Sequence, residues 1–483
     1  MLSYDLEKRG QLPLYEYLYR CIKADISSGE LAADDRLPSK RHLSEHLGIS
    51  LITVEGAYSQ LLAEGYIYTR PRRGYYVCAL PALPTPSSSA FSKPIETHRS
   101  RSVEASTGFS GTATAPLLAD FTRPNALSNS LAADLWGKAI RSTLAHEPQE
   151  VLFESLPLQG SPRLRHAIAE YLYHSRGMRV DEDCILIGAG AQMLYTYISL
   201  LFGAKAPIAL ENPGYPRLAG IYKALGHDIC AIDLDQNGID AFQLERSRAQ
   251  LAHVMPSHQF PTGCVMSVAR RYELLSWASR RPERHIIEDD YDWEFRFAGK
   301  PIPSLQSIDV KGKVIYISTF SKSLSSALRV AFAVLPRPLM NRLNSTLGFL
   351  ANTVSALDQV ALARLIESGD YEKHLNRYKK QSRVLRDELI AALKSSSFGK
   401  HLTIREKDSG LHFVMEVETS HSDIEITQEA LEHGVALAPM SRYLISTHFP
   451  SHSSNSARFV MQYDSIDAER IPEIITALEQ VIG

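Results

Sequence analysis

The chain has 483 residues, of which 44% are apolar and 22% charged, so its length favours two or three domains and its composition a globular protein with a large core. No apolar stretch approaches the ~18 residues of a membrane span and the N-terminus lacks a signal-peptide pattern, so we expect a cytoplasmic protein without membrane contact. The five cysteines are scattered without a CxxC spacing, which argues against a disulfide framework and a zinc site, and the formal net charge of −2 means that DNA binding would need a local basic patch.

The N-terminal segment predicts a helix-turn-helix followed by a β-hairpin. Apolar residues recur every fourth position from Leu14 to Ile26, which is the period of a helix with one buried face. Ser39 is placed to cap a short helix over KRHLSEHL, and Ser50 caps a third helix after the turn LGIS. The stretch GYIYTRPRRGYYV then predicts two strands joined by a Pro/Gly turn, the wing of a winged helix-turn-helix.

Basic side chains gather at two places in this segment, the start of the second helix and the hairpin turn. We predict that five of them contact DNA phosphates: Lys40, Arg41, Arg70, Arg72 and Arg73. The alternative for any one of them is a solvated surface charge. The residues that open the third helix are also predicted to face the DNA: Ser50, Leu51 and Thr53.

This segment resembles the winged-helix domain of the GntR family, in LYEYLYRCIKADISSGEL, DRLPSKRHLSEHLGIS, ITVEGAYSQLLAEGYI and RPRRGYYV. The resemblance implies that residues 1–78 form a domain that binds double-stranded operator DNA. One residue departs from the pattern, because many GntR-like sequences have arginine at the position of Leu51. An apolar side chain there can still contact a thymine methyl group.

The rest of the chain predicts a linker and an α/β domain. Residues 79–118 are rich in Pro, Ser, Thr and Ala and lack apolar periodicity, so we expect a flexible tether. Over residues 119–483, helical patterns separate many of seven strand-like runs: CILIG, PIALE, ICAID, AHVMP, HIIED, KVIYIS and RVAFAVL. This alternation predicts a mostly parallel sheet, whose ligands gather beyond the carboxyl ends of the strands.

Two of the predicted strand ends carry side chains suited to catalysis. In YISTFSKSLSSALR, a strand leads to small hydroxyls, Lys322 and then Arg329; the lysine amine can form a Schiff base while hydroxyls and guanidinium hold a phosphate. A solvated loop lysine is the alternative. In HIIEDDYDWEFRF, Asp289 is our choice for a carboxylate held against a pyridine nitrogen. A cap cluster or a metal site is the alternative there, but no His-rich segment supports a metal.

Two further strand ends are weaker signals. In CILIGAGAQMLYTY, the backbone amides of Gly190, Ala191 and Gln192 would meet phosphate oxygens at a helix N-terminus. In LENPGYPRLAG, the ring of Tyr215 can stack on a pyridine face and Arg217 can bind a carboxylate. A common glycine turn, a core tyrosine and a surface arginine are the alternatives.

In this order the four segments resemble fold-type I pyridoxal 5′-phosphate (PLP) enzymes of the aminotransferase class I/II group. With the N-terminal segment, the whole chain resembles the MocR subfamily of GntR regulators. The resemblance implies PLP as the cofactor and Lys322 as the residue that bonds to it covalently. It also implies the other contacts: Asp289 at the pyridinium, Tyr291 at the ring oxygen, Tyr215 on the ring face, and Thr319, Ser321 and Arg329 at the phosphate.

The segment HQFPTG departs from ordinary aminotransferases, which have asparagine at the position of Phe260. The usual amide contact to the ring oxygen is therefore missing, and His258 or Gln259 is expected to replace it, which puts efficient transamination in question. Near the C-terminus, ARFVMQY resembles the strand that carries the substrate-carboxylate arginine, so Arg458 is a candidate with Arg442 as the alternative.

Three functions fit these residues. The first is a PLP-dependent transcription regulator whose effector, either PLP itself or an amino compound that bonds to it, changes DNA affinity. The second is a working aminotransferase with an accessory DNA-binding domain, and the third is a regulator that keeps the fold only for dimerisation. We favour the first, although Lys322, Asp289 and Arg329 serve the second equally well. The resemblance also implies a homodimer.

Overall fold

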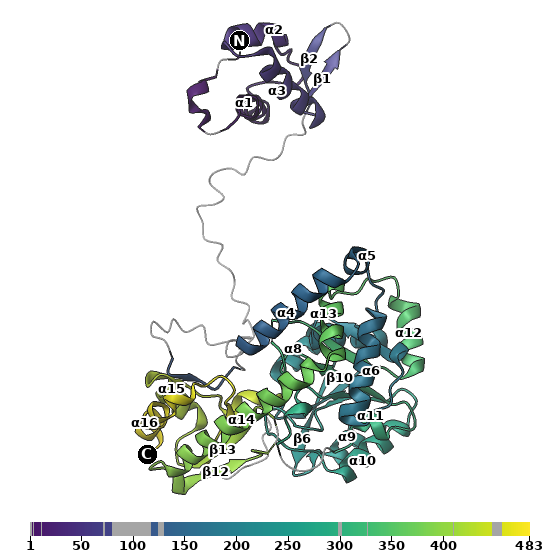
Figure 1. The fold of residues 1–483 in the computed structure, drawn as a ribbon, viewed down its shortest axis with the longest axis vertical. Helices are drawn as coiled ribbons and strands as arrows, with labels where there is room; N and C mark the ends of the chain where they lie inside the picture. The colour runs from purple at the N-terminus through teal and green to yellow at the C-terminus, as the bar shows by residue number, and fades with distance from the viewer. Residues whose placement is uncertain are drawn as a thin grey trace. The chain divides into compact units, whose positions relative to one another are not determined.

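The computed structural model divides the chain into two compact units, Met1–Glu104 and Ala105–Gly483 (Figure 1). The structure describes residues 2, 4–10, 12–70, 73–79, 117–123, 130–297, 302–325, 327–408, 410–446 and 456–483. Nearly all of the predicted linker, residues 80–116, lies outside the described residues, and so does Arg72. The predicted domain bounds and the flexibility of the linker stay predictions.

The first unit is a small helical domain with a two-stranded hairpin. Its elements are η1 (Leu6–Arg9), α1 (Leu14–Ser28), α2 (Lys40–Leu47), α3 (Leu51–Ala63), β1 (Ile67–Arg70) and β2 (Gly74–Val77). Ser39 and Ser50 cap α2 and α3, each accepting a hydrogen bond of 3.2 Å from a backbone amide of the first turn. Apolar faces of the three helices and one residue from each strand form a common core: Leu18, Ile22, Leu43, Val54, Tyr58, Leu61, Ile67 and Val77. The helix-turn-helix and the hairpin therefore form where the sequence predicts them.

The second unit is built on an eight-stranded sheet in the order β4-β11-β10-β9-β8-β5-β6-β7. The strands are β4 (Ile185–Gly188), β5 (Ile208–Asn212), β6 (Ile229–Asp235), β7 (Gly238–Ile239), β8 (Leu251–Val254), β9 (His285–Asp289), β10 (Val314–Thr319) and β11 (Ala331–Val334). The five strands from β10 to β6 run parallel, whereas β11 is antiparallel to both of its neighbours and β7 to β6. All seven predicted strands lie in this sheet, which confirms the α/β class.

Helices cover both faces of this sheet. They are α4 (Ser130–His146), α5 (Gln149–Phe153), α6 (Pro162–Arg176), α7 (Ala191–Phe202), α8 (Pro216–Ala224), α9 (Ala241–Arg246), α10 (Val268–Ser279), α11 (Leu305–Ile308), α12 (Arg337–Leu347) and α13 (Ala356–Glu367), with η2 (Glu182–Cys184) and η3 (Trp293–Phe295). Along β10, Ile315 and Ile317 pack with α7, α8 and α12. The alternate residues Val314 and Tyr316 pack with α10 and α6 on the other face. Double-sided burial explains the continuous apolar runs of these strands.

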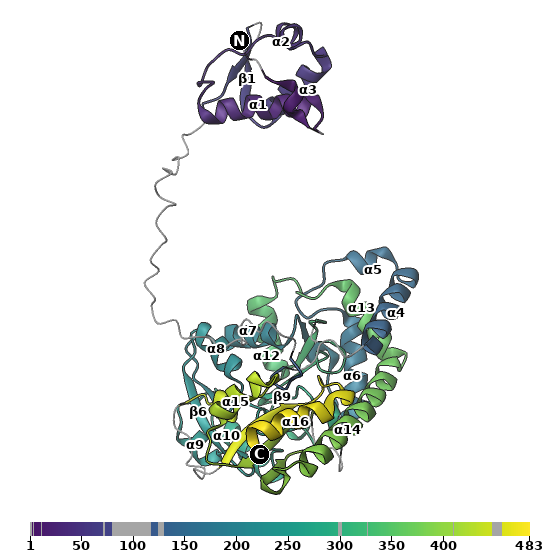
Figure 2. The ribbon, with the colours of Figure 1, turned by 90° about the vertical axis from the view of Figure 1, so that its left-hand side faces the viewer.

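A smaller layer is formed by the last part of the chain together with one short strand that precedes the large sheet in sequence. Its elements are β3 (Ala119–Asp120), α14 (Asp370–Ser395), η4 (Gly399–His401), β12 (Leu402–Arg405), β13 (His412–Glu418), α15 (Asp423–Glu432), β14 (Val435–Ala436), η5 (Met440–Tyr443), β15 (Ser456–Gln462), η6 (Ala468–Arg470) and α16 (Ile471–Ile482). The antiparallel sheet β12-β13-β15 buries one face against α14, α15 and α16 (Figure 2). Val414 and Val460, on its other face, pack with Phe260 of the large layer. This contact joins the two layers beside the carboxyl ends of the large sheet's strands.

Candidate cofactor site and DNA interface

The predicted cofactor residues converge at one edge of the large sheet. β4, β5, β8, β9 and β10 all direct their carboxyl ends to this edge, and the antiparallel β11 begins there. The edge therefore receives Tyr215 after β5, His258 after β8, Asp289 at the end of β9 and Lys322 after β10. Arg329 reaches it from the segment just before β11. Four chain segments distant in sequence thus supply one site, because Lys322 and Arg329 both lie in the loop between β10 and β11.

Asp289 is fixed by a chain of buried hydrogen bonds. The residue is 4% exposed, and its Oδ2 accepts a hydrogen bond of 2.5 Å from the hydroxyl of Tyr195 and lies 3.3 Å from Nε2 of His253. The hydroxyl of Tyr222 lies 2.9 Å from the other ring nitrogen of that histidine. Burial, and then the charge of Asp289, raises the pKa of Tyr195 well above its ordinary value, so its hydroxyl stays a donor. Nothing among the described residues bonds to Oδ1, which leaves that oxygen for a ring N–H.

The start of α7 and Arg329 form a corner suited to a phosphate group. Gly190 has φ +79°, and a side chain there would collide with the guanidinium of Arg329. No described residue pairs with that guanidinium. The amides of Ala191 and Gln192 have no partner among the described residues either, whereas the amide of Gly190 donates to the carbonyl of Gly188 at 2.7 Å. Gly190 therefore leaves room for the Arg329 guanidinium because it has no side chain. Its amide is already bonded and is not available for the predicted phosphate contact.

Two hydroxyls of the loop after β10 complete this part of the site. Oγ1 of Thr319 accepts a hydrogen bond of 3.1 Å from the amide of Ser321, and the two hydroxyl oxygens lie 3.0 Å apart. The next residue is Lys322, which is partly buried and has no described hydrogen bond or ion pair. The loop therefore presents two hydroxyls and an amine together.

The ring-oxygen side of the site is formed by Tyr291 and His258. The Tyr291 hydroxyl lies 3.3 Å from Nδ1 of His258, and the same nitrogen lies 2.8 Å from Oδ2 of Asp292. Gln259, the other residue predicted for this place, is already engaged: its amide donates to the carbonyls of Pro213, in the segment after β5, and Phe260, and its oxygen accepts from Thr262. The structure therefore leaves His258, not Gln259, beside Tyr291.

Phe260 lies among aromatic rings where aminotransferases have the asparagine. Its ring meets those of Tyr215, His412 and Tyr443 edge to face, at centroid distances of 5.9, 5.2 and 5.2 Å. His412 is buried, and burial followed by the charges of His258 and Lys322 lowers its pKa well below the ordinary value. His412 is therefore a neutral imidazole next to the lysine.

Among the described residues, one group of three could ligate a metal ion: His258, Asp292 and His412. The separation of 2.8 Å between Nδ1 of His258 and Oδ2 of Asp292 is that of a hydrogen bond. That contact already engages two of the three side chains. We therefore describe the group as part of the wall of the cofactor site.

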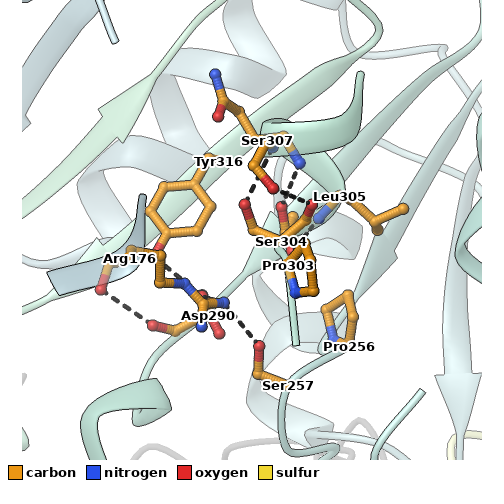
Figure 3. Close-up of polar contacts among 12 residues, drawn as sticks. Arg176, Pro256, Ser257, Asp290, Pro303, Ser304, Leu305, Ser307 and Tyr316 are labelled. Carbon is orange, nitrogen blue, oxygen red and sulfur yellow. Dashed lines mark hydrogen bonds and ion pairs between the residues drawn. The ribbon is translucent and has the colours of Figure 1, made fainter. Parts of the chain in front are cut away.

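Asp290 faces away from this site. Its carboxylate is 1% exposed, pairs with Arg176 and accepts a hydrogen bond of 2.9 Å from Tyr316 (Figure 3). Arg176 also donates to Ser257 at 2.9 Å. Neighbouring strand-end carboxylates thus have separate roles, because Asp290 is neutralised inside the fold while Asp289 faces the cofactor edge.

The arginines predicted for an effector carboxylate occupy different places. Arg217 is exposed at the start of α8, with its guanidinium 5.9 Å from the ring centre of Tyr215. Arg458 on β15 forms hydrogen bonds of 3.0 and 2.9 Å with Glu416 on β13, which also pairs with Arg405. Arg442 lies in η5. The structure brings Arg217 to the aromatic side of the site, and it pairs Arg458 within the small sheet.

In the first unit, the predicted phosphate contacts divide into two groups. Lys40 pairs with Glu55 at 2.6 Å and Arg70 with Asp34 at 2.9 Å, so each basic group has an acidic neighbour that the sequence did not reveal. Arg41 and Arg73 are exposed, and neither has an ion pair with a described residue.

The start of α3 is open to solvent. Leu51 is 40% exposed, and the hydroxyls of Ser50 and Thr53 lie 2.8 Å apart. Ile52, which the sequence reasoning did not single out, is 81% exposed and adds an apolar side chain to this end. The first turn of the helix thus carries the predicted apolar contact surface.

Several residues of the candidate site escaped the sequence reasoning. Tyr195 and His253 looked like ordinary members of an apolar helix and an apolar strand, and His412 lies in a strand of the small layer. Only the fold brings them to Asp289 and Lys322. The five cysteines are free, and no helix among the described residues is long and apolar enough to cross a membrane.

Comparison with known proteins identifies both units. Residues 14–77 match the bacterial regulatory proteins of the gntR family, and residues 126–475 match aminotransferase class I and II. The chain is a GntR-family transcription regulator with an aminotransferase-like domain. The aminotransferase fold family typically uses PLP, and a GntR-type helix-turn-helix implies DNA binding. The predicted fold and the resemblance to GntR regulators are thereby confirmed.

Three relatives align with nearly the whole length of this GntR regulator, and one of them is named MocR, as the resemblance predicted. It is 37% identical to the uncharacterized HTH-type transcriptional regulator YhdI of Bacillus subtilis, over 92% of each chain. It is 30% identical to the probable rhizopine catabolism regulatory protein MocR of Rhizobium meliloti, over 98% of this chain and 94% of the other. It is also 30% identical to the pyridoxine biosynthesis transcriptional regulator PdxR of Corynebacterium glutamicum, over 91% and 92%.

Solved aminotransferases share the fold of the second unit. The multiple substrate aminotransferase of Thermococcus profundus aligns with a TM-score of 0.65 at 21% identity, covering 77% of this regulator and 92% of that chain. At this identity the likeness establishes the fold of the second unit.

Proposed function

We propose that this regulator binds operator DNA through its first unit and senses a ligand at the Lys322 site of its second unit. The ligand is PLP itself or an amino compound that bonds to bound PLP. One observation carries this proposal: the guanidinium of Arg329, which pairs with no described residue, lies against Gly190 and the start of α7, at the edge that also receives Asp289 and Lys322. A fold kept only for dimerisation would not need Asp289, Lys322 and Arg329 together at one edge of the sheet.

The residues of this edge fit PLP. Arg329, the amides of Ala191 and Gln192, and the hydroxyls of Thr319 and Ser321 would hold the phosphate. Tyr215 would lie on the ring face, and Tyr291 with His258 at the ring oxygen. Oδ1 of Asp289, which has no partner among the described residues, would accept from the ring N–H.

The chemistry divides between the cofactor and the chain. When bound, PLP supplies an aldehyde that captures amines and a ring that withdraws electrons from the captured carbon. Tyr195 and His253 hold the Asp289 carboxylate at the place where it would bind the ring nitrogen and favour its protonated form. His412 stays neutral and therefore does not add a second positive charge beside the Lys322 amine.

For an amino compound with a carboxylate, we propose Arg217 as the binding residue, because it lies beside Tyr215 and has no ion pair among the described residues. Arg458 stays a second candidate, although its pairing with Glu416 would have to be broken. The name of the relative PdxR, a regulator of pyridoxine biosynthesis, supports the alternative in which PLP itself is the effector.

On the DNA side, we propose that Arg41, Arg73 and Arg72 contact phosphates and that the start of α3 contacts bases, in a homodimer that presents two such units. The exposed apolar Leu51 supports a contact to thymine methyl groups.

The test compares operator binding with turnover. We expect added PLP or an amino compound to change the operator affinity of the full chain by about tenfold or more. In parallel, keto-acid product is measured over many turnovers with a panel of amino acids. Sustained turnover without any change in DNA affinity would favour a working aminotransferase instead.

A further inference from the structure

A cavity with both polar and apolar lining lies next to the cofactor site. It has a volume of about 330 Å³ and is lined by the end of α6, the segment around Ser257, residues 292–294, Arg296 and the first half of α14. It shares His258 with the cofactor site but is not lined by Lys322, Asp289 or Arg329. Its volume is at the lower end of the range of small-molecule pockets.

Glu294 lines this cavity and has one carboxyl oxygen without a hydrogen-bond partner. The residue is 5% exposed, and its Oε1 accepts hydrogen bonds from Tyr171 at 3.3 Å and Tyr371 at 3.2 Å. Its Oε2 is buried and has no partner. Burial, as the largest cause, raises the pKa of Glu294 to about 8, so its carboxyl group is mostly protonated and acts as a donor at neutral pH. A buried polar atom without a partner is rare in native proteins and indicates a missing ligand or water.

Two cationic side chains, Arg296 and Lys379, line the same cavity. Nε of Arg296 is buried and unbonded. Lys379 is partly buried, and burial lowers its pKa while the nearby Glu294 opposes that shift. Neither Arg296 nor Lys379 forms an ion pair with a described residue. Partly buried cations without counter-ions are costly, so the cavity favours an anion.

The other charges around the cavity are already compensated or lie in solvent. Arg176 is paired with Asp290 and bonded to Ser257 (Figure 3), and Asp292 is bonded to His258. Glu372 is exposed. The groups that remain for a ligand are therefore a guanidinium, an ammonium and a carboxyl O–H, all of which donate.

We propose that this cavity is a second ligand site, which binds a small anion through a carboxylate or phosphate group held by Arg296, Lys379 and Glu294. The proposal goes beyond the proposed function, because it requires neither PLP nor DNA. A carboxylate and a phosphate offer the same acceptor geometry to these donors, so the two sources are separate arms of the test.

The experiment is a calorimetric titration of the PLP-saturated full chain with sodium phosphate and, separately, with sodium succinate at constant ionic strength. We expect saturable binding of at least one anion at millimolar concentration or below. Lys379→Met and Arg296→Met should each weaken it about tenfold or more, because each removes a charge-assisted hydrogen bond. Lys380→Met is the matched control, since that lysine is one position along α14, exposed and not part of the cavity; it should bind as the unchanged protein does.

Melting temperature and the PLP absorbance spectrum establish that each variant is folded. If Arg296→Met does not fold, the comparison of Lys379→Met with Lys380→Met decides alone. Absence of saturable binding for both anions would overturn the proposal. Equal affinities of Lys379→Met and Lys380→Met would overturn it as well, because the anion would then bind elsewhere.

Discussion

The hydroxyl of Tyr195 donates a hydrogen bond of 2.5 Å to Oδ2 of Asp289, across 94 positions of sequence. The bond fixes the carboxylate that would face the ring nitrogen of PLP. We predict that Tyr195→Phe weakens PLP binding by about tenfold, the typical effect of losing a hydrogen bond to a charged group. The affinity is measured by absorbance titration of the apoprotein. Tyr197→Phe is the control, because Tyr197 is equally buried in α7 without a described hydrogen bond; equal losses in the two variants would contradict this role.

The Lys322 amine is the predicted covalent attachment point. Lys322→Ala should fold and lose the yellow colour together with the adduct that borohydride traps, which mass spectrometry detects. Lys205→Ala, in the exposed turn after α7, should keep both. A trapped adduct that persists in Lys322→Ala would assign the bond to another lysine.

Gly190 and Gly203 cap the two ends of α7, both with positive φ, so alanine strains the backbone at either place by about 1 kcal/mol. Only at Gly190 would the added methyl group also collide with Arg329, whereas it meets open space at Gly203. We predict that both variants lose similar stability in thermal unfolding but that only Gly190→Ala loses PLP affinity. Equal PLP affinities would show that Arg329 does not hold the phosphate at this corner.

Burial of Glu294 predicts a specific pH dependence of stability. Its pKa is about 8 in the fold and near 4.3 in an unfolded chain, so the unfolded state releases its proton first as the pH rises. The contribution to stability is complete below about pH 4 and is lost between the two values, at up to about 1.4 kcal/mol per pH unit. Glu294→Gln cannot ionise and should therefore melt at a relatively higher temperature at pH 8 than at pH 5, compared with the unchanged protein. A pH-independent difference between the two proteins would contradict the raised pKa.

The pairing of Lys40 and Arg70 changes what we expect of the DNA contacts. Replacing Arg41 or Arg73 by alanine should reduce the slope of log affinity against log salt by about one unit per lost phosphate contact. Lys40→Ala and Arg70→Ala should change it less, because Glu55 and Asp34 already neutralise these groups. Identical slopes for all four variants would show that the ion pairs of Lys40 and Arg70 do not weaken their contacts with DNA phosphates.

The sequence predicted the parts of the site that are local in the chain. Lys322 and Arg329 belong to one loop, and Gly190 to one strand-turn-helix unit, so their chemistry is visible as a short pattern. The bond from Tyr195 to Asp289 could not be predicted in this way, because an apolar helix gives no sign of which carboxylate its tyrosine meets.

The same limit applies to the charges. Lys40 and Glu55 are 15 positions apart and meet only because α2 packs on α3. Arg458 and Glu416 pair through the register of two strands that are distant in sequence. The fold agrees with the choice of Asp289 over Asp290, because Asp289 faces the cofactor edge. Arg176 neutralises Asp290, and nothing in the sequence indicated that pairing.

The most direct test of the central claim measures operator affinity by fluorescence anisotropy while PLP, alone or with an amino compound, is added to the full chain and to Lys322→Ala. We predict that the ligand changes the operator affinity of the unchanged protein and leaves that of Lys322→Ala constant, while both bind DNA in the absence of ligand. An operator affinity that responds equally in the two proteins, or in neither, would contradict a sensor built on the Lys322 site.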